Sequence, residues 1–149
     1  MCGIIGVLGQ ENSSVLVKKG LSVLKNRGKD NFGILDEDHS PRYSKDLDKL
    51  KTLKEAKNSI GHCLHSVVSH VRQPLKKEDS ALAVNCEIYN WKNISDTENI
   101  SAKNDSEMLF QILDKHMKDK EGKEEDNIFQ NILEKIDGVY ALCYQKKDK

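Results

Sequence analysis

The sequence predicts an α+β fold in which antiparallel sheet is covered by helices. Apolar segments short enough for strands occur near the start, in the middle and at the end of the 149-residue chain, and segments with helical spacing of apolar residues lie between them. Strands and helices that do not alternate regularly favour antiparallel pairing. The length suits one hydrophobic core, so residues 1–149 are expected to form a single domain.

The first elements follow from an apolar run and from helix caps. Residues 4–8 predict a strand. A helix is expected to begin at an Asn or Ser within residues 12–14 and to end at Arg27-Gly28, because Asn and Ser are favoured N-caps and Gly is favoured just beyond a helix. Residues 32–35 predict a second strand.

Residues 36–59 form the least regular part of the pattern and predict a surface excursion. A polar loop is followed by Leu47, Leu50 and Leu53, whose spacing fits one face of a helix. The chain then returns to an apolar strand over residues 60–68, which ends before Pro74 because proline cannot donate to a sheet ladder.

The second half predicts a strand, two helices and a final strand. The apolar residues 82–84 run into the polar and aromatic segment 85–91, and such strand ends are where sites are often built. Asn104 or Asp105 is the expected cap of a helix, and Glu107, three residues after Asn104, matches the pattern of a capping box. A further helix is expected over residues 128–136, and residues 139–145 alternate as a strand.

Composition excludes several classes of partner. Lys plus Arg and Asp plus Glu both number 24, so the net charge is zero and bulk charge favours neither nucleic acid nor a membrane surface. The sequence contains no long apolar run for a transmembrane helix and no signal-peptide pattern. The four cysteines lack CxxC spacing and are interpreted as reduced thiols, which indicates a cytoplasmic protein.

The start Met1-Cys2-Gly3 is the feature with the clearest chemical meaning. When Met1 is removed, the thiol and the free α-amine stand on the same residue, Cys2. An α-amine has a pKa of about 7.7–8.0 and can accept the thiol proton, so that a thiolate attacks a carbonyl carbon. The alternative from this segment alone is an ordinary strand that carries one small apolar cysteine.

A zinc site is the weaker interpretation of the segment that contains His62, Cys63, His65 and His70. Neighbouring residues on a strand face opposite sides, so His62 and Cys63 diverge. The paired spacing of structural zinc sites is also missing. We therefore expect no metal ligands in the chain.

Several segments together resemble the class II glutamine amidotransferase domain, an N-terminal-nucleophile hydrolase, and most closely the glutaminase domain of asparagine synthetase. In chain order these segments are Cys2-Gly3-Ile4-Ile5-Gly6, Arg27-Gly28-Lys29-Asp30-Asn31-Phe32-Gly33, Gly61-His62, Gln73-Pro74-Leu75, Val84-Asn85-Cys86-Glu87-Ile88-Tyr89-Asn90, Asn104-Asp105-Ser106-Glu107 and Ile136-Asp137-Gly138-Val139-Tyr140-Ala141-Leu142. The resemblance implies a four-layer αββα fold with two antiparallel sheets between helix layers. It also implies hydrolysis of the glutamine side-chain amide to glutamate and ammonia.

The resemblance assigns the catalytic roles. Cys2 would form a γ-glutamyl thioester, and its α-amine would carry the proton to the leaving ammonia. Asn85 matches the residue whose side-chain amide stabilises the oxyanion. Cys86 stands where the family usually has glycine, and its backbone N–H still serves if the residue needs no glycine-only conformation. Arg27 and Asp30 are expected to support the site.

The resemblance also assigns substrate-binding residues. Glu87 and Asp105 match the acidic residues that bind the α-ammonium group of glutamine. The substrate would lie along the segment Leu64, His65, Ser66, Val67 and Val68. The family commonly has arginine at the position of Leu64, where it pairs with the α-carboxylate, and leucine cannot do so. We expect Arg72 to substitute, with His65 as another candidate, although Arg72 also fits a surface charge on a loop.

The expected partners are glutamine and an ammonia-accepting synthetase domain or subunit. The sequence does not decide whether the chain forms a homo-oligomer. No phosphate loop for ATP occurs in the sequence, so ATP and Mg²⁺ would belong to the partner and this chain would need no cofactor. The family domain usually continues beyond the last strand. The chain thus fits a stand-alone glutaminase subunit, the front of a split or truncated synthetase, or a degenerate binding or regulatory module. The ammonia acceptor would be an activated aspartate or, alternatively, a sugar phosphate or ribosyl pyrophosphate.

Overall fold

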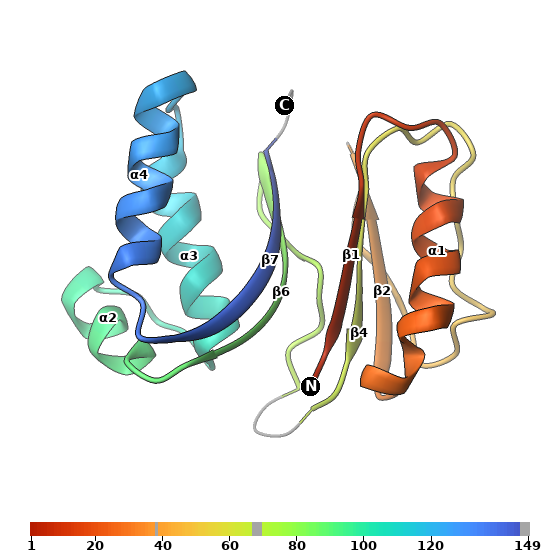
Figure 1. Ribbon diagram of the computed structural model, residues 1–149, viewed down its shortest axis with the longest axis horizontal. Coiled ribbons are helices and arrows are strands. Elements are labelled where there is room, and N and C mark those ends of the chain that lie inside the picture. Colours follow the sequence, from red (N-terminus) through yellow and green to blue (C-terminus); the bar gives the residue numbers. More distant parts are fainter. Residues whose placement is uncertain (38, 67–69, 147–149) are drawn as a thin grey trace. The chain divides into compact units, whose positions relative to one another are not determined.

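The computed structural model describes residues 1–37, 39–66 and 70–146, and this part of the chain contains two antiparallel sheets and four α-helices (Figure 1). The predicted α+β class is confirmed. The chain divides into two compact units: Met1–Asn85 together with the last segment from Ala141, and Cys86–Tyr140. No helix of the described residues is long and apolar enough to cross a membrane.

The first unit contains a four-stranded sheet in the order β1, β4, β2, β3. The strands are β1 (Gly3–Val7), β4 (Ser59–Leu64), β2 (Asn31–Asp36) and β3 (Arg42–Ser44). Cys63 on the central strand lies opposite Gly3 on one side and Phe32 on the other. This register brings the start of β1 beside the end of β4, so the chain terminus is placed at one end of the sheet.

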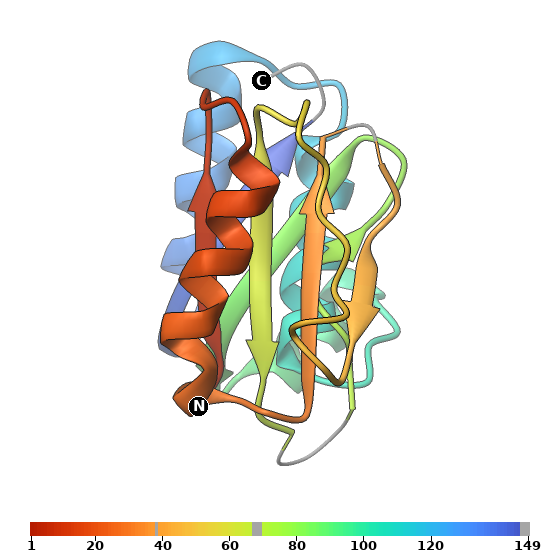
Figure 2. The same ribbon diagram turned by 90° about the vertical axis from the view of Figure 1, so that its right-hand side faces the viewer.

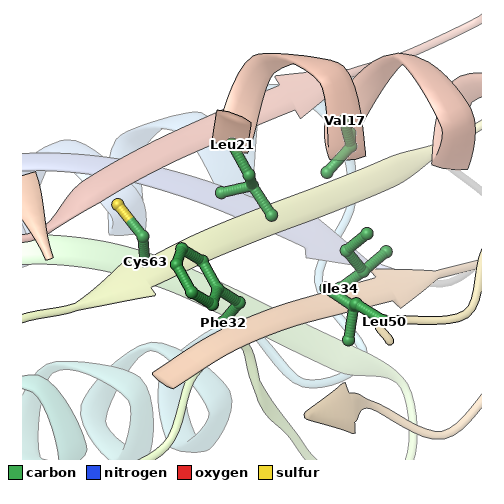
Figure 3. Close-up of a cluster of buried hydrophobic side chains, with 6 residues drawn as sticks. All are labelled: Val17, Leu21, Phe32, Ile34, Leu50 and Cys63. Atoms are coloured by element: carbon green, nitrogen blue, oxygen red, sulfur yellow. The ribbon is translucent and has the colours of Figure 1, made fainter. Parts of the chain in front are cut away.

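Helix α1 (Ser13–Leu24) covers one face of this sheet, as Figure 2 shows. Its apolar stripe packs against alternate residues of β2 and β4 in a core cluster drawn in Figure 3, made of Val17, Leu21, Phe32, Ile34, Leu50 and Cys63. Asn12 precedes the helix in a left-handed conformation and makes no side-chain cap. The short 3₁₀ turn Lys25–Arg27 ends the segment.

The second sheet is formed by β5 (Leu75–Lys76), β6 (Ser80–Ile88) and β7 (Gly138–Lys146), with β6 in the middle. Within the first unit it packs on the four-stranded sheet through a second apolar cluster, whose members are Ile4, Leu35, Ile60, Ala81, Ala83 and Cys143. The two faces of β4 therefore serve two cores: Cys63 lies under α1, whereas Ile60 lies between the sheets.

The second unit is mainly helical. It comprises the end of β6, α2 (Trp91–Glu98), α3 (Asp105–Met117), α4 (Gly122–Glu134) and the start of β7. Helices α2 and α4 both contact α3, which buries Met108, Leu109, Ile112 and Leu113 (Figure 1).

A buried polar network ties separate elements of the first unit together. The Asp36 side chain, at the end of β2, is 0 % exposed and accepts hydrogen bonds from Arg42 and from the Ser59 hydroxyl. The Ser13 hydroxyl bonds in turn to Ser59 at 2.7 Å. Arg42 also donates to the backbone of residue 51, so the network joins β2, β3, β4, α1 and the following excursion.

Three expectations about elements were wrong. Leu47, Leu50 and Leu53 form no helix; Leu50 is instead 2 % exposed within the core under α1. A leucine spacing of three fits a helix, but this segment has no regular secondary structure. Residues 91–98 form a helix that the sequence patterns did not predict. The last helix covers Gly122–Glu134 and not residues 128–136, because its amphipathic pattern begins among the charged residues 123–126.

Candidate active site

Cys2 lies directly before β1, and segments from three other places in the first unit hold it. Its backbone N–H donates to Asn85 Oδ1 at 3.0 Å, and its carbonyl accepts from Arg27 Nε at 2.9 Å. The backbone N–H of His65 donates to Cys2 Sγ at 3.3 Å, and the carbonyl of His65 lies 3.7 Å from the same sulfur. The end of β6, the turn after α1 and the segment after β4 thus converge on one cysteine.

A second set of contacts fixes the segment after β4. Asp30 donates its backbone N–H to the Leu64 carbonyl at 3.0 Å and accepts the Ser66 N–H on Oδ2 at 2.7 Å. Gly28 lies so close that a Cβ there would stand 2.4 Å from the Leu64 carbonyl carbon. The Arg27–Asp30 segment therefore clamps the backbone that presents the His65 N–H to sulfur.

Burial is the largest influence on the pKa of the Cys2 thiol. Burial raises its pKa above the ordinary value, and the nearby Asp30 carboxylate acts in the same direction. The His65 N–H, the N-terminal amine and Arg27 act the other way. Because the pKa stays raised while Met1 is present, the thiol needs a neighbouring base before it can attack.

Asn85 presents its amide in a definite orientation. Its Oδ1 accepts from Cys2, so its Nδ2 is the donor end of a group that already touches the cysteine. Cys86 follows directly and has no positive φ, since the non-glycine residues with positive φ in the described chain are Asn12, Asn99 and Asp119. The backbone N–H of Cys86 therefore needs no glycine-only conformation.

Glu87 and Asp105, which are predicted to bind the ammonium group, both belong to the second unit. They are linked by a hydrogen bond from the backbone next to Glu87. Asp105, the first residue of α3, accepts the Ile88 N–H on Oδ2 at 3.1 Å, and Ile88 follows Glu87 on β6. Glu87 is exposed and Asp105 is half-buried. Both carboxylates thus lie near the end of β6.

The predicted substrate segment is only partly described. Leu64 ends β4 and is buried, His65 is exposed with its Nδ1 3.8 Å from Asp30, and Ser66 is half-buried. Val67 and Val68 lie outside the described residues. The predicted strand over residues 60–68 is confirmed as far as Leu64.

Arg72 has a structural neighbour in the sheet. Its guanidinium carbon stands 5.9 Å from the ring centre of Tyr43, on β3. β1, which follows Cys2, and β3 are the two edge strands of the first sheet. The role of Arg72 in binding a carboxylate stays a prediction, as does that of His65.

The described residues contain no group of three or more His, Cys, Asp or Glu side chains placed to hold a metal ion. Cys63 packs under α1, whereas the neighbouring His62 ring lies beside Val84 of β6, so the two side chains diverge as expected. Among the described residues the four cysteines form no disulfide.

Sequence patterns missed two features of the site. The backbone of His65, rather than its side chain, contacts the Cys2 sulfur, and a backbone donor leaves no signal in residue type. The contact of Asn85 with Cys2 joins residues 83 positions apart, and only the fold brings them together.

Comparison with known sequences found relatives that share one description. No family model matches the chain. It is 29% identical, over 99% of its length, to the glutamine--fructose-6-phosphate aminotransferase of Methanococcus maripaludis, and 27% identical, also over 99%, to that of Halalkalibacterium halodurans. The chain spans only 28% of the length of either relative.

A solved structure shares the fold. The glutamine phosphoribosylpyrophosphate amidotransferase from B. subtilis, in complex with ADP and GMP, superposes with a TM-score of 0.74 at 21% identity, over 98% of this chain and 35% of that one. The expected N-terminal-nucleophile hydrolase fold is thereby confirmed. The specific resemblance to asparagine synthetase is not shown by these relatives.

Proposed function

We propose that this chain, which has the fold of class II glutamine amidotransferases, hydrolyses the side-chain amide of glutamine and supplies ammonia to an acceptor domain. The observation that carries the proposal is the setting of Cys2. Its sulfur is held by the His65 N–H, and its backbone nitrogen is held by the Asn85 amide oxygen.

The reaction begins when Met1 is removed and the nitrogen of Cys2 becomes a free amine. This amine takes the thiol proton, and sulfur attacks the side-chain amide carbon of glutamine. The C–N bond then breaks, and the amine returns the proton to the leaving ammonia. Water hydrolyses the thioester to glutamate and regenerates the thiol. The raised thiol pKa supports the need for this adjacent base.

Asn85 Nδ2 and the backbone N–H of Cys86 stabilise the oxyanion that forms at each addition step. Removal of one such donor typically lowers kcat by about 10²–10³. Asn85 is suited to the role because Oδ1 already holds the nucleophilic residue, which leaves the donor end of the same rigid amide for the intermediate.

Substrate recognition uses carboxylates for the ammonium group of glutamine and a cation for its carboxylate. We assign Glu87 and Asp105 to the ammonium group. Arg72 or His65 takes the carboxylate in place of Leu64, which is buried and apolar. A carboxylate left unpaired on binding would weaken affinity.

Ammonia passes to a separate acceptor domain in the cytoplasm, and any ATP and Mg²⁺ chemistry belongs to that partner. The names of the relatives favour a sugar phosphate or phosphoribosyl pyrophosphate as acceptor. The segment Asn85–Asn90 favours an activated aspartate, as in asparagine synthesis. The buried Leu64 favours a second candidate function, a catalytically degenerate binding or regulatory module of the same fold.

The first prediction tests the nucleophile. Cys2→Ala is expected to abolish glutamate release from glutamine while the circular dichroism spectrum stays unchanged, because sulfur and not packing is lost. Cys143→Ala removes a thiol of similar burial in the core and should keep the activity. Mass spectrometry of the N-terminus establishes that Met1 is absent from the assayed protein. Equal release by the wild type and by Cys2→Ala would instead support the degenerate module.

A further inference from the structure

Two buried side chains that have no role in the proposed mechanism lie against the backbone of Val84, the residue before Asn85. Gln73 lies just before β5 and is 5 % exposed, and His62 lies on β4 and is 1 % exposed. Both belong to the first unit, as does Val84 on β6.

Gln73 replaces a missing strand partner of Val84. In the β5–β6 pairing Leu75 lies opposite Leu82 and Lys76 opposite Ala81, and extension of this antiparallel register places position 73 opposite position 84. β5 begins only after Pro74, which has no N–H to offer a ladder. The side chain takes over: Gln73 Oε1 accepts the Val84 N–H at 2.7 Å, and the bond is buried.

The backbone of Gln73 lies against the first sheet. Its backbone carbonyl lies against Gly33 of β2, where a Cβ would stand 1.9 Å from that oxygen. The first sheet therefore fixes the backbone of Gln73. Its side chain spans the distance from there to Val84 on β6. A fixed acceptor for the Val84 N–H fixes the Ala83–Val84 peptide, which lies one residue before Asn85.

His62 lies against the carbonyl side of Val84. The Val84 carbonyl approaches the ring, although neither ring nitrogen completes a hydrogen bond within the described residues. Burial keeps this imidazole neutral, with its pKa lowered to about 4. The Val84 backbone is thus enclosed by Gln73 at its N–H and by His62 near its carbonyl.

We propose that Gln73 is a positioning residue that acts through Asn85: by anchoring the Val84 N–H, it sets the Asn85 amide against Cys2 and so aligns the donor that receives the oxyanion. The inference rests on the proposed glutaminase function. It gives a role to the Gln73-Pro74-Leu75 segment that no other step of the mechanism uses.

The test is a double-mutant cycle on the whole chain. Asn85→Ala is expected to lower kcat for glutamine hydrolysis by about 10². Gln73→Met keeps the side-chain volume and loses the hydrogen-bond acceptor. It should lower kcat by about tenfold and change KM by less than twofold, because the lost interaction stabilises the transition state.

When Gln73→Met is added to Asn85→Ala, kcat should fall no further, since both changes remove the same interaction. Gln111→Met, which deletes an exposed side-chain bond to a backbone carbonyl, is the matched control and should leave kcat unchanged.

A second readout requires no turnover. The rate of Cys2 alkylation by iodoacetamide is followed by peptide mass spectrometry between pH 7 and 10. Asn85→Ala and Gln73→Met should both change the alkylation rate at pH 8 by at least threefold, and in the same direction. The double variant should have the same pH profile as Asn85→Ala. If Gln73→Met does not fold, Gln73→Asn, whose shorter amide cannot reach Val84, replaces it in both cycles.

The outcomes separate the two claims. Additive losses in either cycle, or a Gln73 variant that raises KM at unchanged kcat, overturn the positioning role. A wild type without glutaminase activity overturns the proposed function alone, and the alkylation profiles then still decide whether Gln73 acts through Asn85.

Discussion

His62 shows how one buried residue makes stability depend on pH. The ring is 1 % exposed, lies between the two sheets and has its pKa lowered from 6.5 to about 4 because burial disfavours the charged form. In the unfolded chain the ring titrates near its ordinary value. Between these pH values only the unfolded state binds the proton, so acid favours unfolding.

The resulting prediction concerns the free energy of urea unfolding. Above about pH 6.5 His62 is neutral in both states and does not change the free energy of unfolding. As pH falls from 6.5 toward 4, the unfolded state binds the proton first, and the free energy of unfolding falls by about 3 kcal/mol in total. His62→Leu should remove this part of the pH dependence, whereas His70→Leu, at an exposed histidine, should keep it. Parallel curves for the wild type and His62→Leu over this range would show that the ring is not buried neutral.

At the residue scale, candidate functional side chains could be predicted from the sequence. The backbone contacts that position them could not. Cys2, Asn85 and Asp105 stand in recognisable motifs, because the role predicted for each depends on the type of its side chain. Gly28 and the backbone of His65 matter through close approach and hydrogen-bond direction. Those properties depend on which strands become neighbours, and one sequence carries little information on that pairing.

Among the elements, α3 is the one that its local sequence specifies best. Asn104 adopts an extended conformation, and its Oδ1 accepts the Glu107 N–H at 3.0 Å. Glu107 Oε2 accepts the N–H of Lys103 at 2.8 Å, one residue earlier than in the standard capping box. The cap satisfies donors that the helix itself leaves unpaired.

Asn104→Ala should therefore lower the free energy of unfolding by about 1 kcal/mol. Asn104→Ser keeps a side-chain oxygen at the N-cap and should retain most of the stability. Urea unfolding followed by circular dichroism measures both variants. Equal loss in Ala and Ser would mean that the side-chain oxygen contributes nothing at this helix end.

Elements without such local signals were harder to predict. The segment of residues 45–58 has helical leucine spacing, yet Leu50 enters the core from an irregular backbone. The Lys18 ammonium group holds this segment by donating to the carbonyls of Asp48 and Leu50. Tertiary contacts of this kind outweigh a weak local preference, and they involve residues about 30 positions apart.

At the scale of the whole molecule, the fold class was predictable because the order of apolar segments limits the choice of sheet. The division of the chain into two compact units was not. The boundary falls within β6 and β7, and a continuous strand gives no change in composition at such a point.

The polar network around Asp36 is expected to hold the first unit together, because it joins elements that are distant in sequence. Arg42→Met leaves the fully buried Asp36 carboxylate without its cation and should lower the free energy of unfolding by about 3–5 kcal/mol. Lys49→Met breaks an exposed ion pair with Asp46 and should cost less than about 1 kcal/mol. Comparable losses in the two variants would show that burial gives the Asp36 pair no special weight.

Met1 is 76 % exposed, whereas the sulfur beside it is already seated against His65. Under the proposed chemistry, a peptidase that removes Met1 meets an exposed residue, and the removal needs no change in the sulfur contact. The chain is then inactive while Met1 is present, although the contacts of Cys2 with His65 and Asn85 are already formed. A single proteolytic cut decides when the chain becomes active.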